Sequence, residues 1–171
     1  MQPTMIVLRL IHIFSGVMWV GGVALLTWFI VPSLSGAGPA GGGVMKFLLT
    51  KTKFGPYFPS LAGLTVLSGI FMFWWDASRS KGVFYASPMG ITLSIGGLAG
   101  IIGFIFGGAV VGRGANAMAR VFRAIDAQGG PPTAEQTAEL TALREKLAWA
   151  SKIVMPLLLI AVIAMAVARY V

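Results

Sequence analysis

The chain has 171 residues, of which 57% are hydrophobic and only 11% are charged, and its mean hydropathy is +0.85. Soluble domains carry about 25% charged residues, so this composition excludes an ordinary soluble domain and indicates a membrane protein. The net charge is +8, and the absence of cysteine excludes disulfides, thiolate metal sites, iron–sulfur clusters and c-type haem attachment.

The first long apolar stretch predicts a helix over about residues 5–31. It has no charged residue from Leu10 to Val31, and about 20 apolar residues suffice to cross a bilayer as a helix. The stretch is longer than the core of a cleaved signal, and only Arg9 precedes it as a basic residue, so we expect the helix to be retained. The Gly-, Pro- and Ser-rich stretch 32–43 has no apolar period and predicts a flexible loop.

Residues 44–54 mix apolar residues with lysines. This pattern predicts a short amphipathic segment in the membrane interface or, as the alternative, a simple lead into the second helix. We expect the second helix over about residues 55–76. Aromatic residues lie at both of its ends, as in the aromatic belts that sit at headgroup level. They are Phe54, Tyr57 and Phe58 at one end and Phe73, Trp74 and Trp75 at the other.

The third helix, expected over about residues 88–128, carries the strongest periodic signal in the chain. Five glycines in it recur at spacings that place them on one helical stripe. Within a bilayer, a stripe of small residues lets another backbone or a flat ring approach closely. We expect a tight contact within the bundle; the alternatives are a groove for a pigment, haem or lipid, and a contact with another subunit. The five are Gly96, Gly100, Gly103, Gly107 and Gly114.

The third helix is expected to continue beyond the membrane. Its last part places Met118, Phe122 and Ile125 on one face. The sequence QGGPP, residues 128–132, then breaks the helix.

A fourth helix is expected over about residues 133–170. Thr133 and Gln136 form a capping box that starts it, and Pro156 is expected to bend it because proline lacks a backbone donor. Together with the end of the third helix it predicts a helical hairpin, about residues 113–150, that projects about 20 Å into the cytoplasm. Its apolar stripe consists of Leu140, Leu143, Leu147 and Ala150.

The basic residues divide unequally between the two sides of the membrane. If four helices span it, the first and third loops hold nine of the 13 Lys and Arg, and the two termini with the second loop hold the other four. The positive-inside rule places the larger set in the cytoplasm and both termini in the periplasm. Anionic lipid accounts for these charges, so no nucleic-acid partner is expected. The larger set is Lys46, Lys51, Lys53, Arg113, Arg120, Arg123, Arg144, Lys146 and Lys152; the smaller is Arg9, Arg79, Lys81 and Arg169.

His12 is the only histidine and the only ionisable residue inside the predicted spans. All five acidic residues fall at or beyond the membrane edge, so we expect no catalysis by this chain alone. Helical spacing places Gly16 and Trp19 on the His12 face. Gly16 would leave space for a haem ring, and Trp19 would line one side of the pocket. In such a pocket, neutral imidazole ligates haem iron.

Other interpretations of His12 stay open. The simplest is a hydrogen bond to Ser15, to a carbonyl or to a neighbouring helix. If haem is bound, Met72 or Met165 would supply a sulfur as the second ligand, or a partner would supply a second histidine. A copper site is the third possibility, because Met1 and Met5 are soft ligands near the same end of the first helix.

His12 with Trp19, Gly21 and Gly22 forms the pattern H-x6-W-x-G-G. This resembles the first-helix signature of the copper-resistance D superfamily of bacterial membrane proteins. A similar helix occurs in the membrane protoporphyrinogen oxidase family, whose members bind haem through a histidine there. The last quarter of the chain resembles uncharacterised four-helix members of that superfamily. The resemblance implies a bacterial inner-membrane location and His12 as a candidate axial ligand of haem b or another tetrapyrrole; no polar position of the oxidase family other than His12 can be matched.

These patterns predict an all-α membrane protein, a single domain over residues 1–171, with four transmembrane helices in a bundle and a cytoplasmic hairpin. The expected function is that of a non-catalytic membrane subunit, an accessory or scaffold component of a larger respiratory or photosynthetic complex. Its expected partners are lipid and other membrane subunits. The alternatives are a small haem or tetrapyrrole protein that uses His12, and a copper-handling membrane protein.

Overall fold

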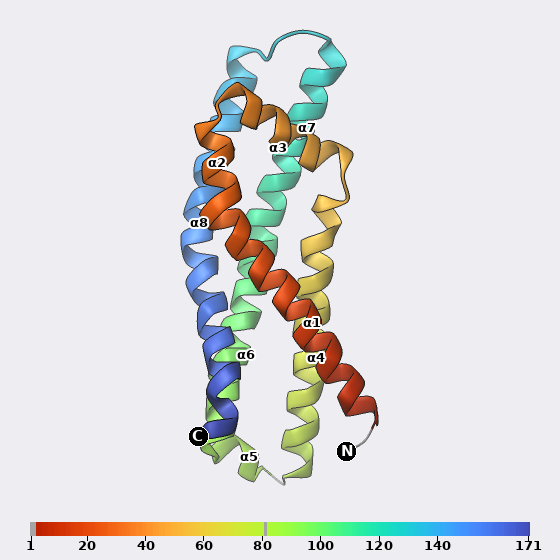
Figure 1. The fold of residues 1–171 in the computed structure, drawn as a ribbon, viewed down its shortest axis with the longest axis vertical. Coiled ribbons are helices and arrows are strands. Elements are labelled where there is room, and N and C mark those ends of the chain that lie inside the picture. The colour runs from red at the N-terminus through yellow and green to blue at the C-terminus, as the bar shows by residue number, and fades with distance from the viewer. Residues whose placement is uncertain (1–2, 81) are drawn as a thin grey trace.

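The computed structural model describes residues 3–80 and 82–171, and all regular structure in them is helical (Figure 1). Four helical stretches are long and apolar enough to cross a membrane, which confirms the all-helical class and the number of candidate spans. Met1 and Lys81, which the copper hypothesis and the charge comparison use, lie outside the described residues. The four stretches are Pro3–Gly36, Phe54–Arg79, Pro88–Gln128 and Ala134–Tyr170.

The first stretch does not end at Pro32. α1 (Pro3–Leu25) continues through the π-helical segment η1 (Leu26–Ile30) into α2 (Val31–Gly36). Pro32 falls in the first turn of α2, directly after the π-helical turn, and such a local widening of the helix accommodates a proline and its missing donor.

The predicted flexible loop over 32–43 is therefore wrong. After a turn in which Gly38 has φ +58°, α3 (Pro39–Lys51) begins with a proline, a residue that suits the first helical position. Gly41 is required by packing, because a Cβ atom on it would lie 1.9 Å from the carbonyl oxygen of Leu34. Glycine lets α2 and α3 approach closely here, whereas composition alone indicated a break.

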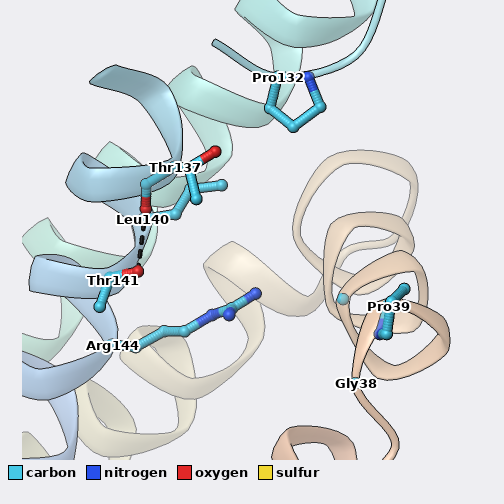
Figure 2. Close-up of a pocket in the computed structure, with 8 residues that line it drawn as sticks. Gly38, Pro39, Pro132, Thr137, Leu140, Thr141 and Arg144 are labelled. Atoms are coloured by element: carbon cyan, nitrogen blue, oxygen red, sulfur yellow. Dashed lines mark hydrogen bonds between the residues drawn. The ribbon is translucent and has the colours of Figure 1, made fainter. Parts of the chain in front are cut away.

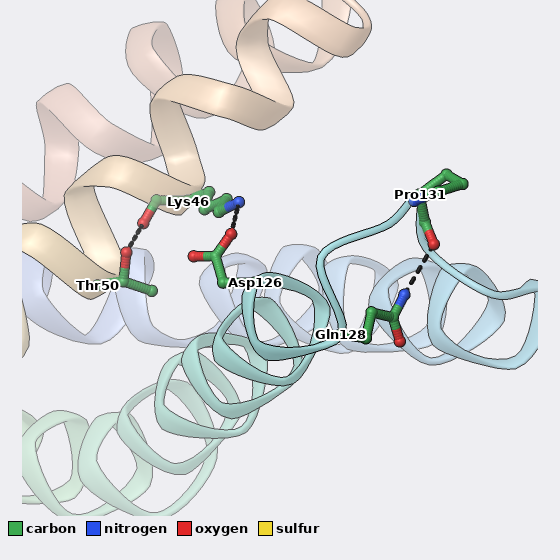
Figure 3. Close-up of polar contacts among 5 residues, drawn as sticks. All are labelled: Lys46, Thr50, Asp126, Gln128 and Pro131. Atoms are coloured by element: carbon green, nitrogen blue, oxygen red, sulfur yellow. Dashed lines mark hydrogen bonds and ion pairs between the residues drawn. The ribbon is translucent and has the colours of Figure 1, made fainter.

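α3 has a packing role that neither interpretation of residues 44–54 included. Its Met45 and Leu49 pack against the end of the third stretch, α7 (Arg113–Gln128). Lys46 also forms an ion pair with Asp126 of α7 (Figure 3).

The remaining helices complete four passes along the long axis of the molecule. α4 (Phe54–Arg79) is joined by the short α5 (Val83–Ala86) to α6 (Pro88–Phe106). α6 continues through the π-helical η2 (Gly107–Gly112) into α7, and α8 (Ala134–Val167) ends in η3 (Ala168–Tyr170). Both termini and α5 lie at one end of the molecule, and the turn between α7 and α8 lies at the other (Figure 1).

Large apolar side chains on the four stretches point mostly outward. Phe14, Leu67 and Leu98 are 70%, 68% and 61% exposed. Contiguous apolar surface of this kind is uncommon on soluble monomers and is the surface that lipid covers in a membrane. Two buried clusters hold the helices together. One joins Trp19 of α1, Leu61 and Ala62 of α4, and Val154 and Leu158 of α8.

The second cluster lies at the end opposite the termini. It consists of Met118, Val121 and Phe122 of α7 and Leu140 of α8, and Met45 and Leu49 of α3 pack on it. The predicted apolar faces of the two helices therefore meet, and the predicted capping box of Thr133 and Gln136 is confirmed. We call α3, α7 and the first half of α8 (residues 134–150) the headpiece.

Candidate functional site

His12 lies in a polar cluster between α1 and α4. Its Nδ1 atom is 2.7 Å from the backbone oxygen of Thr65 and 3.4 Å from Oγ of Ser68. The Thr65 hydroxyl donates to Oγ of Ser15 at 2.8 Å, and the Ser15 hydroxyl donates to the carbonyl of Ile11 at 2.6 Å. Ser15 and Ser68 are the buried polar side chains of the described residues. The cluster therefore links side chains of one helix to the backbone of the other.

The contact with Thr65 determines which ring nitrogen of a neutral His12 carries the hydrogen. A carbonyl oxygen can only accept, so Nδ1 carries the hydrogen and Nε2 keeps its free electron pair. No buried side-chain nitrogen or oxygen in the described part of the chain lacks a hydrogen-bond partner, and the described residues offer none to Nε2. Nε2 therefore reaches the surface of the α1/α4 pair.

Glycines bring the two helices close enough for this cluster. A Cβ atom on Gly69 would lie 2.8 Å from Cε1 of His12, so the imidazole rests on the α4 backbone. A Cβ atom on Gly16 would lie 3.4 Å from Cγ2 of Thr65. Thr65 thus occupies the space beside Gly16 in which we expected a haem ring.

Two other residues of the H-x6-W-x-G-G pattern, Trp19 and Gly22, serve helix packing. Trp19 is 6% exposed and meets Phe104 edge to face, with 6.4 Å between ring centroids. Gly22 faces the ring of Phe58, whose Cε1 would be 2.6 Å from a Cβ atom there. Gly21 has no described residue within 4 Å of its Cβ position. The sequence placed His12, Gly16 and Trp19 on one face, but it did not reveal the residues of α4 that meet them.

A tetrapyrrole does not fit between α1 and α4 at His12, because Thr65 and Gly69 already fill that side of the ring. Met165, one suggested second ligand, packs its methyl group 3.6 Å from the Cβ position of Gly96 on α6. A ligand of His12 would have to reach Nε2 from outside the helix pair.

The glycine stripe of α6 faces α8. Cβ atoms on Gly96, Gly100 and Gly103 would lie 2.8 Å from Cβ of Ala164, 3.7 Å from Cβ of Ala161 and 3.3 Å from Cδ2 of Leu158. At the start of the headpiece, a Cβ atom on Gly114 would lie 2.8 Å from Cδ2 of Leu147.

Gly107 requires a correction, because no described residue lies within 4 Å of its Cβ position. Its N–H still bonds to the carbonyl of Gly103, so α-helical spacing keeps it on the same side of the helix as the other glycines. Helix α8 does not approach the stripe closely at this level.

A cavity of about 360 Å³ lies between the turn that precedes α3 and the first half of α8 (Figure 2). The Arg144 side chain reaches toward α3, and its Nη2 atom would be 3.7 Å from a Cβ atom on Gly42. The Thr141 hydroxyl donates to the carbonyl of Thr137, which is part of α8 itself. Arg144 is exposed, so the cavity is an open feature of the headpiece surface.

No protein-family model matches the chain, and comparisons with curated proteins and with solved structures found no match either.

Proposed function

We propose that this chain is a non-catalytic integral membrane subunit, an accessory or scaffold component of a larger respiratory or photosynthetic complex. In this proposal the four apolar stretches form a bundle in a bacterial inner membrane. The headpiece lies in the cytoplasm and both termini lie in the periplasm, in line with the larger number of basic residues on the headpiece side.

The observation that carries the proposal is the headpiece. Its helices share their own buried cluster around Met118 and Phe122, and the Lys46–Asp126 ion pair adds a further link to α3. A projection with its own hydrophobic core holds a fixed surface, which is what docking to a partner requires. The exposed apolar side chains of the spans offer a second surface, for lipid and for neighbouring spans.

The test is purification of the tagged chain from its native membranes in a mild detergent, followed by native electrophoresis. We expect a band well above the mass of a homo-oligomer, with other subunits present in fixed ratio. Recovery of the chain alone, or only of its own oligomers, would overturn the proposal.

The second candidate function is binding of haem or another tetrapyrrole by His12, and one observation favours it. A histidine that ligates a metal usually donates its other ring N–H to a carbonyl or carboxylate, as Nδ1 does here to Thr65. The tetrapyrrole would then be bound to Nε2 of His12, outside the α1/α4 pair. We expect a Soret band in protein made with haem supply, its loss in His12→Ala, and its retention in the control Phe14→Ala. A colourless wild-type protein would rule this candidate out.

A further inference from the structure

α7 carries a cationic face that none of the described residues covers. Arg113, Asn116, Arg120 and Arg123 recur every three or four residues, so they form one stripe, and all four are exposed. The stripe lies opposite Met118, which is buried against α8 and α3. Within the described residues the one ion pair is Lys46–Asp126, so these arginines have no carboxylate partner.

α8 carries acidic residues on its own outer face. Glu135 and Glu139 are one turn apart and exposed, and neither pairs with a base among the described residues. Glu135 lies in the first turn of α8, where the helix dipole already favours an acid. Glu139 lies beyond that turn, so the dipole does not account for it.

The two charged faces lie at the same height. The contact between Gly114 and Leu147 fixes the register of α7 against α8. At 1.5 Å per residue, Arg123 is about 13 Å beyond this contact along α7, and Glu139 is about 12 Å beyond it along α8. Two copies of the chain in one membrane share depth and orientation, so Arg123 of one copy can meet Glu139 of its neighbour.

In the proposed membrane placement, lipid headgroups do not reach Arg120 and Arg123, the two arginines of the stripe that lie farthest from the bilayer. If α6 spans the bilayer as proposed, Arg113 lies at the membrane surface and Arg123 lies about 15 Å beyond it. The headgroup region is only about 5–8 Å thick on each side. The complement of Arg120 and Arg123 is therefore an acidic protein surface.

We propose that the arginine face of α7 binds the acidic face of α8 in a second copy of this chain, so that copies stand side by side in the membrane. This inference uses the proposed membrane placement but not the proposed accessory role. A protein that forms only its own oligomers would overturn the accessory role and leave this inference intact.

Cross-linking tests the contact directly, because the native chain has no cysteine. Arg123→Cys and Glu139→Cys are introduced into two differently tagged copies, which are co-expressed and treated in membranes with a short bis-maleimide. We expect a cross-linked product that carries both tags. The matched control pairs Arg123→Cys with Thr141→Cys, which is exposed on the side of α8 that lines the cavity, and should give none.

Charge reversal distinguishes self-association through the arginine face of α7 from binding of another protein or of anionic lipid to that face. Arg120→Glu with Arg123→Glu should abolish self-association, as should Glu135→Lys with Glu139→Lys, and co-expression of the two variants should restore it. The inference is overturned if the Arg123/Glu139 pair gives no mixed product. It is equally overturned if the arginine variant keeps its oligomeric state, or loses only a different acidic protein or binding to anionic vesicles.

Discussion

The two helix pairs of this protein use different means to bring their backbones together. α1 and α4 meet through a histidine and three hydroxyl side chains that bond across the contact or to backbone carbonyls. α6 and α8 meet through glycines that face Ala164, Ala161 and Leu158. Helix association within lipid lacks a hydrophobic driving force between helices, so both interhelical hydrogen bonds and close backbone packing can supply it. The first contact thus combines glycine packing with side-chain hydrogen bonds, whereas the second depends on close packing alone.

For these two contacts, the largest effect is expected at Gly96, which has a backbone oxygen and a Cβ atom of α8 as neighbours. Gly96→Ile would place a branched side chain 2.8 Å from Cβ of Ala164 and 3.3 Å from the carbonyl of Ala161, so one helix must move. We expect a loss of about 1–3 kcal/mol in unfolding free energy. Thermal unfolding in detergent measures it. Gly97→Ile is the matched control, because no described residue lies within 4 Å of the Gly97 Cβ position. Equal losses in both variants would refute the packing role.

His12→Ala tests the chemical contact and is expected to have a smaller effect. The substitution removes the bond to Thr65 and the ring that rests on Gly69, at a cost of about 1–2 kcal/mol. The same unfolding assay applies, with the exposed Phe14→Ala as control. An unchanged stability would show that the polar cluster does not hold α1 to α4.

The hydroxyl bond between Thr65 and Ser15 is expected to contribute less still. A double-mutant cycle of Ser15→Ala and Thr65→Val should give a coupling of about 0.6 kcal/mol, the average for hydrogen bonds between membrane helices. Strictly additive losses would mean that the two hydroxyls act independently.

Gly107→Ile should have the smallest effect of all. Because its Cβ position is open, we expect a change within about 0.5 kcal/mol in the unfolding assay. A loss as large as that of Gly96→Ile would show that the stripe extends through η2 after all.

Local pattern predicted much of the fold. The four apolar stretches, the apolar faces of α7 and α8, and the capping box of Thr133 and Gln136 depend on residues near one another in sequence, and the structure contains them. The prediction of a loop over 32–43 was wrong because glycine and proline usually indicate a break. Here Pro32 lies within a continuous helical stretch, Pro39 begins α3, and Gly41 allows a close approach of α2 and α3.

The surroundings of His12 could not be predicted in the same way. Its partner Thr65 is 53 residues away, and a serine, a threonine and a glycine at helical spacing on α4 give no strong signal alone. The open position at Gly107 has a similar cause, since the approach of another helix to a glycine depends on residues that are distant in sequence.

The central claim, that four helices cross a membrane and hold the headpiece on the cytoplasmic side, is tested most directly by thiol labelling. Single cysteines replace Ala134, which is exposed at the start of α8, or Val83, which is 72% exposed in α5 at the opposite end. An impermeant thiol reagent is then applied to spheroplasts. We expect labelling of Val83→Cys, and labelling of Ala134→Cys only after the membrane is opened. Labelling of both in sealed spheroplasts, or of Ala134→Cys alone, would contradict the claim.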